Sequence, residues 1–482
     1  MRVFTLVVGF LSLSTLASQS WAVSFLSFDA RSMSMGSTGV VMARSHNASL
    51  FNPALLIDTD PKRQTRFHMH TYAGARLLDR DNFLDTADQF RTRYEGMTLD
   101  ELLDIDLNLA PTEFASGDEL RAATGRIRAA QADINGLSNK PLRVSASYGW
   151  SFSYPTTHWS IGGYVREFAV LGSMVNVADA DNAAIDRLAN TVESFANLLD
   201  EVIELRESTE GRTRFTLEEV IDRADPLVDA IWDLNRYVNF PELRSDVQLG
   251  VASDRNVQEY LREPLPDGFQ STIDSRGAEV TEQAISVARS FNGGEALPGL
   301  IHLGINFKYV DFTTISFSQP VDEFSLSAYR EDEYRLSHRR FNMDMGMVYG
   351  PSDQVHIGLV VRNLIPRDFA TVDGEPIPLR PIARMGIGYR NRNVNLTADL
   401  DVTRNEPLGF DPDKQYLGLG AEWFAWRNTA LRAGLRYNTV DGETLPSLGF
   451  GLGGRHGHLD LAVAKSSNGD EWGLAFQAGL AF

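Results

Sequence analysis

Residues 472–482 read Trp472-Gly473-Leu474-Ala475-Phe476-Gln477-Ala478-Gly479-Leu480-Ala481-Phe482, and this stretch decides the fold. Every even-numbered residue in it is apolar, and every odd-numbered residue is small or polar. A strand with one apolar and one polar face, about 9–11 residues long, has the length that a tilted strand needs to cross a bilayer. A β-sandwich strand shows similar alternation, but a soluble chain rarely ends on such a strand with a terminal Phe. The stretch therefore predicts the last strand of a bacterial outer-membrane β-barrel.

The same strand carries a candidate barrel-assembly signal. Its residues are Trp472, Phe476, Leu480 and the terminal Phe482, because the closing strand of such barrels ends on an aromatic residue that serves as the signal. The barrel-assembly machinery and outer-membrane lipid are the partners that this interpretation implies.

The other end of the chain indicates export. Met1-Arg2 is a short positive start, residues 3–17 are an apolar run too short for a spanning helix, and Ser20-Trp21-Ala22 places small residues where a signal peptidase cuts. We expect residues 1–22 to be a cleaved signal peptide. A membrane anchor is the alternative, but no stop-transfer stretch follows.

The composition of the 482-residue chain excludes several classes of protein. Cysteine is absent, which leaves neither a disulfide framework nor a thiolate metal site. Mean hydropathy is −0.21, and beyond the signal no segment approaches the roughly 18 uninterrupted apolar residues of a spanning helix. The formal net charge is −19, and removing Arg2 with the signal makes it −20. Such an acidic chain lacks the basic footprint of nonspecific nucleic-acid binding, so no direct nucleic-acid partner is expected.

Alternation with a period of two recurs along the chain, which a helix would not sustain. Aromatic residues lie near many of the segment ends, where an interfacial girdle would place them. The clearest strands, about thirteen, are 65–74, 142–154, 158–171, 301–309, 341–349, 355–361, 383–389, 394–402, 417–423, 431–437, 448–452, 459–463 and 472–482.

An outer-membrane barrel has an even number of strands with both ends of the chain in the periplasm, so one strand is missing from this set. The best candidate is Thr272 to Phe291, whose pattern is ambiguous between helix and strand. Counting it gives an antiparallel barrel of about 14 strands over residues 65–482, with external insertions at 75–141 and 172–270. If the missing strand lies before residue 65 instead, both insertions lie in the periplasm.

Charged residues on the luminal faces are expected to pair across strands. A two-residue turn at Asn391-Arg392 places Arg384 opposite Asp399, and the same arithmetic places Glu422 opposite Arg432. Opposite charges at facing positions contribute about 0.2–1 kcal/mol each. These pairs either only neutralise each other inside the lumen, as a structural feature, or form a charged constriction.

The two insertions carry apolar stripes with helical spacing. Ile185, Leu188, Val192, Phe195, Leu199 and Val202 are spaced by three and four residues, and similar stripes run over 120–137 and 217–234. We expect α-helical insertions that form a small antiparallel bundle. The bundle is either a self-contained cap or a docking surface for a protein partner.

Residues 23–64 precede the first strand and form a predicted N-terminal luminal plug, where close backbone approach favours glycine. The motif Ala30-Arg31-Ser32-Met33-Ser34-Met35-Gly36, followed by Asn52-Pro53-Ala54, is similar to the opening plug of the long-chain fatty-acid transporter superfamily. On this resemblance Ala30, Arg31, Met33, Met35, Gly36, Asn52, Pro53 and Ala54 are plug residues, although Pro53 alternatively only shapes a turn.

Within that superfamily the chain resembles the conjugal-transfer TraF-like outer-membrane family. The matching stretches are 358–366, 396–403, 416–422 and 431–438, and the resemblance covers nearly the whole chain after the signal, insertions included. It implies a fourteen-stranded barrel with a luminal plug. The conjugation label does not establish movement of DNA, and the acidic balance argues against direct DNA contact.

The sequence shows no catalytic constellation, so an enzyme is not expected and neither is a cofactor. His68 and His70 share a strand face, and His456 and His458 share a turn, so each pair offers two metal ligands. The sequence places no third ligand beside either pair, and no metal site is expected.

Two functions remain. The first is a plugged channel for uptake of a small hydrophobic or amphipathic ligand. The second is a structural outer-membrane component of a conjugation- or secretion-type envelope assembly, which would dock partners through its helical insertions. Apolar residues lining the lumen beside the plug would favour transport, whereas a lumen filled only by charge pairs would favour the structural role.

Overall fold

The computed structural model describes residues 27–58, 67–95, 116–209, 270–295, 297–321, 324–405, 408–426, 428–454 and 456–482, with a few isolated positions between them. The predicted signal peptide and nearly all of the helical stripe at 217–234 lie outside the described residues.

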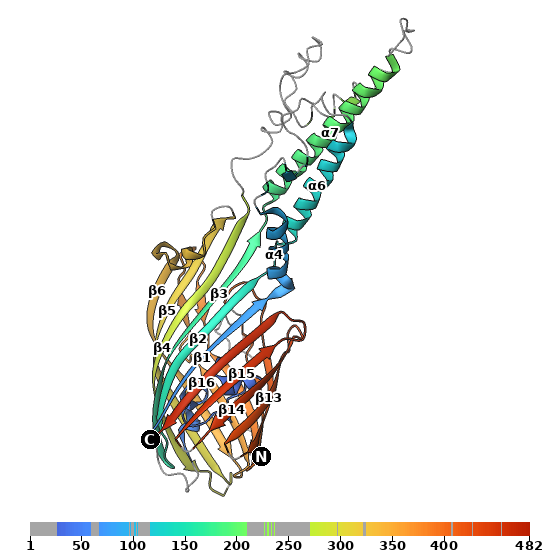
Figure 1. Ribbon diagram of the computed structural model, residues 1–482. Coiled ribbons are helices and arrows are strands. Elements are labelled where there is room, and N and C mark those ends of the chain that lie inside the picture. The colour runs from blue at the N-terminus through green and yellow to red at the C-terminus, as the bar shows by residue number, and fades with distance from the viewer. Residues whose placement is uncertain are drawn as a thin grey trace.

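A closed antiparallel barrel of fourteen strands forms the body of the protein (Figure 1). Successive strands pair with each other, and β1 pairs with β16 to close the barrel. The barrel strands are β1 (His68–Asp79), β2 (Leu142–Tyr154), β3 (Trp159–Asn176), β4 (Thr272–Asn292), β5 (Leu300–Pro320), β6 (Arg335–Gly350), β7 (Val355–Arg362), β10 (Ile382–Arg390), β11 (Val394–Asp401), β12 (Tyr416–Trp426), β13 (Thr429–Asn438), β14 (Thr444–Gly453), β15 (Gly457–Lys465) and β16 (Glu471–Ala481). The predicted fold class is confirmed.

The segment with the ambiguous pattern is a strand. β4 pairs with β3 along one edge and with β5 along the other, so it is the missing fourteenth strand. Both insertions consequently leave the barrel at the end opposite to the C-terminus (Figure 1). Short periplasmic turns and long external loops are the rule for such barrels, so the external position of the insertions stays a prediction. β1 and β3 continue to Asp79 and Asn176, beyond the residues where we placed the start of each insertion.

The barrel wall is apolar outside and polar inside. On β15, for example, Leu459, Leu461 and Val463 are more than half exposed, whereas the alternating Asp460 and Ala462 are buried. A soluble protein would reverse this arrangement. Exposed apolar side chains on the outer face and buried polar ones in the lumen are what a lipid-facing barrel requires. The candidate assembly residues Trp472, Phe476, Leu480 and Phe482 all project to the outer side, with 43–68% of their surface exposed; their role as a signal stays a prediction.

One predicted register is wrong. Arg384 lies opposite Asp401, and Asp399 lies opposite Gly386. The cause is the turn, because the Asn391 side chain accepts hydrogen bonds from the backbone N–H groups of Asn393 and Val394, at 2.8 Å each. An Asn whose side chain accepts from the amides two and three residues later occupies the first of the four positions of a turn. The two central residues are therefore Arg392 and Asn393, one position later than predicted.

Short helices fill the lumen and the loops. Those of the plug are α2 (Ala30–Ser34), α3 (Ala48–Phe51) and the 3₁₀ helix η2 (Pro53–Leu56). Those of the loops are η3 (Arg80–Asn82), α4 (Phe83–Tyr94), α6 (Gly117–Asn135), α7 (Asp179–Thr209), η5 (Leu326–Arg330) and η6 (Asp332–Tyr334). Among the described residues, no helix is long and apolar enough to cross a bilayer.

The helices α6 and α7 pack side by side as an antiparallel pair that projects away from the barrel (Figure 1). Arg128 of α6 pairs with Glu193 of α7 at 2.7 Å, and the amide of Gly117 donates to Asp200 at 2.9 Å. The predicted stripes supply the contact, since Leu120 and Ile127 on α6 are buried, as are most stripe residues on α7.

A charge on the lipid face should destabilise the barrel. Leu461 lies at the middle of β15, between Phe450 and Phe476 on the neighbouring strands. We expect Leu461→Arg to lower the free energy of unfolding by about 2–4 kcal/mol, the cost of a cation near the bilayer midplane. Urea titration of the barrel folded in lipid vesicles measures this, with Leu461→Met as the volume-conserving control. Equal stability of the two variants would contradict the lipid-facing assignment.

Candidate functional site: the plugged lumen

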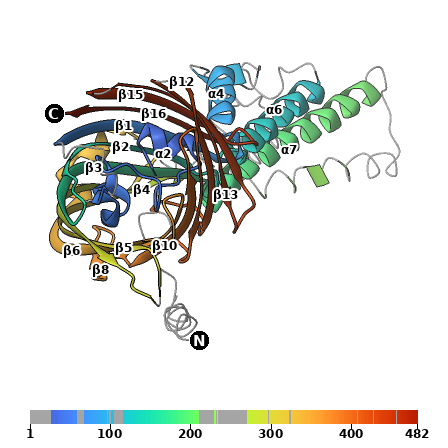
Figure 2. The ribbon, with the colours of Figure 1, turned by 90° about the horizontal axis from the view of Figure 1, so that it is seen from below.

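The plug lies inside the barrel. Figure 2 shows the segment with α2 within the ring of strands, and nearly all of residues 27–58 are buried. The two ends of the plug brace different walls, since α2 packs against β13–β16 and η2 packs against β3–β6. The side chain of Asp29 caps α2 by accepting from the amide of Ser32 at 3.0 Å. The plug is thus a locally structured element and not a loose strand.

An ion cluster that is buried except for Arg44 fixes α2 to the wall. Glu422 of β12 accepts from Arg31 of the plug at 2.7 Å and from Arg432 of β13 at 2.8 Å. Arg44, also of the plug, reaches the same carboxylate at 3.4 Å. Arg432, which lies opposite Glu422 in the register, also bridges to Asp460 at 2.7 Å. The predicted pair Glu422–Arg432 is therefore part of a larger network that is centred on Glu422 and includes two plug arginines.

The remaining predicted lumen charges also contact the plug. Asp399 accepts from the backbone amides of Gly39 and Val40 at 2.7 and 3.0 Å. Arg384 pairs with Asp401 at 2.5 Å and donates to the carbonyl of Ser37 at 3.0 Å. These charges hold backbone groups that a plug buried in the lumen would otherwise leave without partners.

Two close approaches of plug and wall require glycine. Gly36 adopts a positive φ of 69°, and a Cβ on Gly434 of β13 would overlap its amide nitrogen. A Cβ on Gly346 of β6 would likewise overlap the side chain of Asn52. The side chain of Asn52 donates to the carbonyl of Val40 at 2.8 Å and accepts from the amide of Ala54, so that Pro53 begins η2. Ala30, Met33, Met35 and Ala54 are all buried against the wall.

A second region of the lumen is apolar. The two-stranded hairpin of β8 (Arg367–Phe369) and β9 (Ile377–Leu379), which lies in the loop between β7 and β10, belongs to it. The ring of Phe369 stacks on Phe312 of β5, with centroids 4.2 Å apart and planes 7° apart. The buried cluster comprises Phe28 and Leu50 of the plug, Tyr72, Tyr164, Phe168, Val170, Ala278, Val280, Ala284, Val310 and Phe312 of the wall, and Phe369, Ile377, Leu379 and Leu408 of the external loops. An apolar compartment is thus enclosed between the plug and the hairpin.

Buried charges border this compartment. Glu282 of β4 accepts from Arg166 at 2.7 Å and from Lys308 at 3.2 Å. Lys308 also bridges to Asp344 at 2.8 Å. A small cavity of about 10 Å³ lies where Phe168, Val280 and Phe312 meet these charges. The compartment is closed and filled by its own side chains in this conformation.

The hairpin is held by partly exposed polar contacts. Asp373 accepts from Ser316 at 2.6 Å and from Arg276 at 3.0 Å. Partial burial opposes ionisation of Asp373, but these hydrogen bonds outweigh it and lower its pKa to about 2. The Arg276–Asp373 pair remains 30% and 37% exposed. Its contribution to stability is therefore in the range of surface pairs, about 0–1 kcal/mol.

Comparison with known proteins gives the family. The family described as "F plasmid transfer operon, TraF, protein" matches residues 49–401, which is most of the chain. The chain belongs to this TraF family. No curated protein matches it.

Solved structures whose chains follow a similar course include proteins named as a hydrocarbon channel, a FadL homologue and a toluene transporter. A TodX monoaromatic hydrocarbon channel mutant is 9% identical, with 94% of this chain and 98% of that chain covered and a TM-score of 0.44. A Pseudomonas aeruginosa FadL homologue is 10% identical, with 96% and 99% covered and a TM-score of 0.44. The Ralstonia pickettii toluene transporter TbuX is 12% identical, with 94% and 97% covered and a TM-score of 0.33. These TM-scores lie below 0.5, so the fold assignment rests on the strand pairing of the chain itself.

Sequence reasoning missed the apolar compartment of this TraF-family protein and the charges around Glu282. The hairpin segment 367–379 reads as a loop, because its strands are only three residues long. Glu282 lies in the strand whose pattern was ambiguous. Its inward position follows only once Ile285 is known to face lipid.

Removing the central carboxylate should loosen the plug. We expect Glu422→Gln to lower the free energy of unfolding by about 3–5 kcal/mol, because Arg31 and Arg432 would remain buried without their counter-charge. Hydrogen exchange of residues 28–44 should accelerate at the same time. Glu193→Gln removes the exposed α6–α7 pair and should cost at most about 1 kcal/mol. Unchanged exchange in the plug of Glu422→Gln would contradict the anchoring role.

Proposed function

We propose that this protein is a plugged outer-membrane channel through which small hydrophobic or amphipathic molecules enter the cell envelope. The observation that carries the proposal is the apolar compartment between the plug and the β8–β9 hairpin. A barrel with a purely structural lumen needs only paired charges, and β10–β16 contain such charges. The apolar lining contributed by β3–β5 is not needed to neutralise luminal charges, and it matches the chemistry of an apolar ligand.

The energetics favour the hairpin as the entrance. Its polar anchors are partly exposed and contribute at most about 1 kcal/mol each. Its apolar side chains, Phe369, Ile377 and Leu379, are buried at roughly 1.5–3 kcal/mol each. An apolar ligand that takes their place regains much of that free energy. The plug, by contrast, is held by fully buried ion pairs whose disruption costs about 3–5 kcal/mol.

Ligand binding tests the proposal directly. The full chain is purified from outer membranes and its bound small molecules are identified by mass spectrometry. The affinity for a fluorescent fatty acid is measured in parallel. We expect Phe312→Lys to weaken binding at least about tenfold, because it places a cation in the compartment, equivalent to about 1.4 kcal/mol. Phe90→Lys, on the external helix α4, is the control and should bind normally.

Folding of both variants is checked by the shift in electrophoretic mobility on heating that folded barrels show. A folded Phe312→Lys that binds the probe as tightly as the wild type would refute a ligand site in the compartment. A wild type with no bound lipid or hydrocarbon and no affinity for the probe would refute the channel for apolar molecules.

The second candidate function is that of a structural component of an envelope assembly. It is favoured by the α6–α7 pair, which projects well beyond the barrel (Figure 1) and leaves Val202 39% exposed. A helix pair that only capped the lumen would lie across the barrel mouth.

Photo-crosslinking in cells tests this second function. A photoreactive residue at Val202 should give a discrete crosslinked product if the helix pair docks a partner protein. The same residue at Asp441, in the loop between β13 and β14, is the control and should give none. Absence of a product at Val202 would count against docking through α7.

A further inference from the structure

Three histidines from distant parts of the chain converge at one end of the barrel. His46 belongs to the plug, His70 to β1 and His458 to β15. The ring of His46 lies 4.5 Å from that of His458 and 5.0 Å from that of His70. One nitrogen of each ring lies within 4.8 Å of the other two. The fold thus takes one member of each histidine pair seen in the sequence and adds the third imidazole from the plug.

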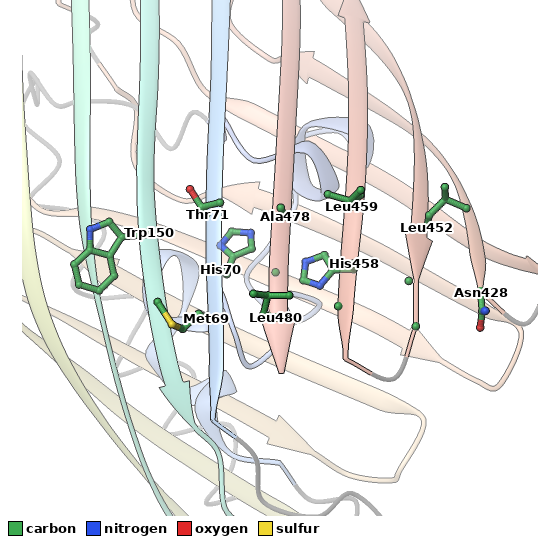
Figure 3. A pocket seen from close by; sticks show the side chains of 14 residues that line it. Met69, His70, Thr71, Trp150, Asn428, Leu452, His458, Leu459, Ala478 and Leu480 are labelled. Carbon is green, nitrogen blue, oxygen red and sulfur yellow. The ribbon is translucent and has the colours of Figure 1, made fainter. Parts of the chain in front are cut away.

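The strand register brings the two wall histidines together. His458 and His70 both lie opposite Gly479 of β16, one on each side. A Cβ on Gly479 would overlap the ring of His458. Glycine at this position leaves room for the ring of His458, and Figure 3 shows the rings of His70 and His458 on either side of β16. The juxtaposition is therefore built into three adjacent strands.

The imidazoles have unused nitrogen atoms. The Nε2 atoms of all three rings are buried, and none makes a hydrogen bond of normal geometry with a described residue. The Nδ1 atom of His70 lies 3.3 Å from the hydroxyl of Ser151, which itself donates to the carbonyl of His46 at 2.6 Å. Metal-bound histidines are commonly oriented in this way, with one nitrogen held by the protein and the other directed to the ion.

We propose that His46, His70 and His458 bind a divalent transition-metal ion of the Zn²⁺ type, which clips the plug to the barrel wall. Imidazole nitrogen suits Zn²⁺, Cu²⁺ and Ni²⁺, and three histidines with one open position form a common zinc site. Zn–N bonds of about 2.0–2.1 Å set the nitrogens about 3.3 Å apart. Binding would therefore draw the three nitrogens, which lie within 4.8 Å of one another, closer together by rotation of the rings. The carboxylate of Asp460, 3.8 Å from His458 Nε2, places a negative charge beside the ion.

The site has open space next to it. A pocket of about 790 Å³ extends to His70 and His458 (Figure 3), and the rest of its lining is mostly glycine and outer-face side chains such as Trp150, Leu459 and Leu480. It lies at the end of the barrel that carries the C-terminus and the β14–β15 turn. Binding of an ion to the three imidazoles would join the plug to β1 and β15 at once.

Zinc titration of the full chain in detergent micelles tests the proposal. The protein is stripped with a chelator and titrated with Zn²⁺ in competition with a chromophoric chelator. We expect one ion per chain in the wild type. Each of His46→Ala, His70→Ala and His458→Ala should weaken binding at least about 100-fold, more than the loss of an outer-shell partner does. His456→Ala, in the exposed turn two residues from His458, is the matched control and should bind like the wild type.

A measurement on the wild type alone keeps the test independent of whether the variants fold. Zn²⁺ should slow hydrogen exchange around residues 44–48, because the ion would tie that segment to two strands. One bound ion, lost in the three variants and retained in His456→Ala, together with slower exchange, supports the clip. The absence of stoichiometric binding by the wild type, equal binding by all variants, or unchanged exchange would overturn it.

Discussion

Charged side chains of the barrel strands cannot face lipid, so each of them needs a counter-charge or a hydrogen-bond partner inside the lumen. Alternation sends half of the wall residues inward, among them Arg384, Asp399 and Glu422, and burial without partners would cost several kcal/mol for each ion. The plug provides partners, since Arg31 pairs with Glu422 and the amides of Gly39 and Val40 both donate to Oδ2 of Asp399. Plug and wall therefore depend on each other, because neither presents a satisfied surface without the other.

Most strands could be predicted from the sequence because the bilayer imposes a pattern of period two, whereas β4, with its ambiguous pattern, was found from the even number of strands that a barrel requires. The plug could be located through the motif around Met33 and Asn52. Register could not be predicted with the same accuracy, since a single side-chain hydrogen bond at Asn391 moved the turn by one position and gave Arg384 another partner. Hydrogen bonds from side chains in turns involve only residues two or three positions apart, so they produce no periodic pattern in the sequence.

Contacts between distant segments were beyond sequence reasoning. The rings of Phe312 and Phe369 stack on each other, yet Phe312 is in a strand and Phe369 is in a loop whose sequence shows no strand pattern. His46 likewise lies in a segment of small residues and meets His70 and His458 only because the plug folds back along the wall. Each strand individually predicts which side chains face inward, but the closure of the barrel decides which of them meet.

The two ends of the lumen are restrained to different degrees, and this difference bears on direction. On the external side, partly exposed pairs such as Arg276–Asp373 hold the hairpin over apolar side chains that a ligand can replace. Toward the C-terminal end, fully buried ion pairs hold the plug, and the histidine cluster offers a further restraint there. In the proposed channel, entry from outside is therefore the less costly step. Release past the plug needs the buried network around Glu422 to rearrange, because moving Arg31 removes one of the cations that balance this buried carboxylate.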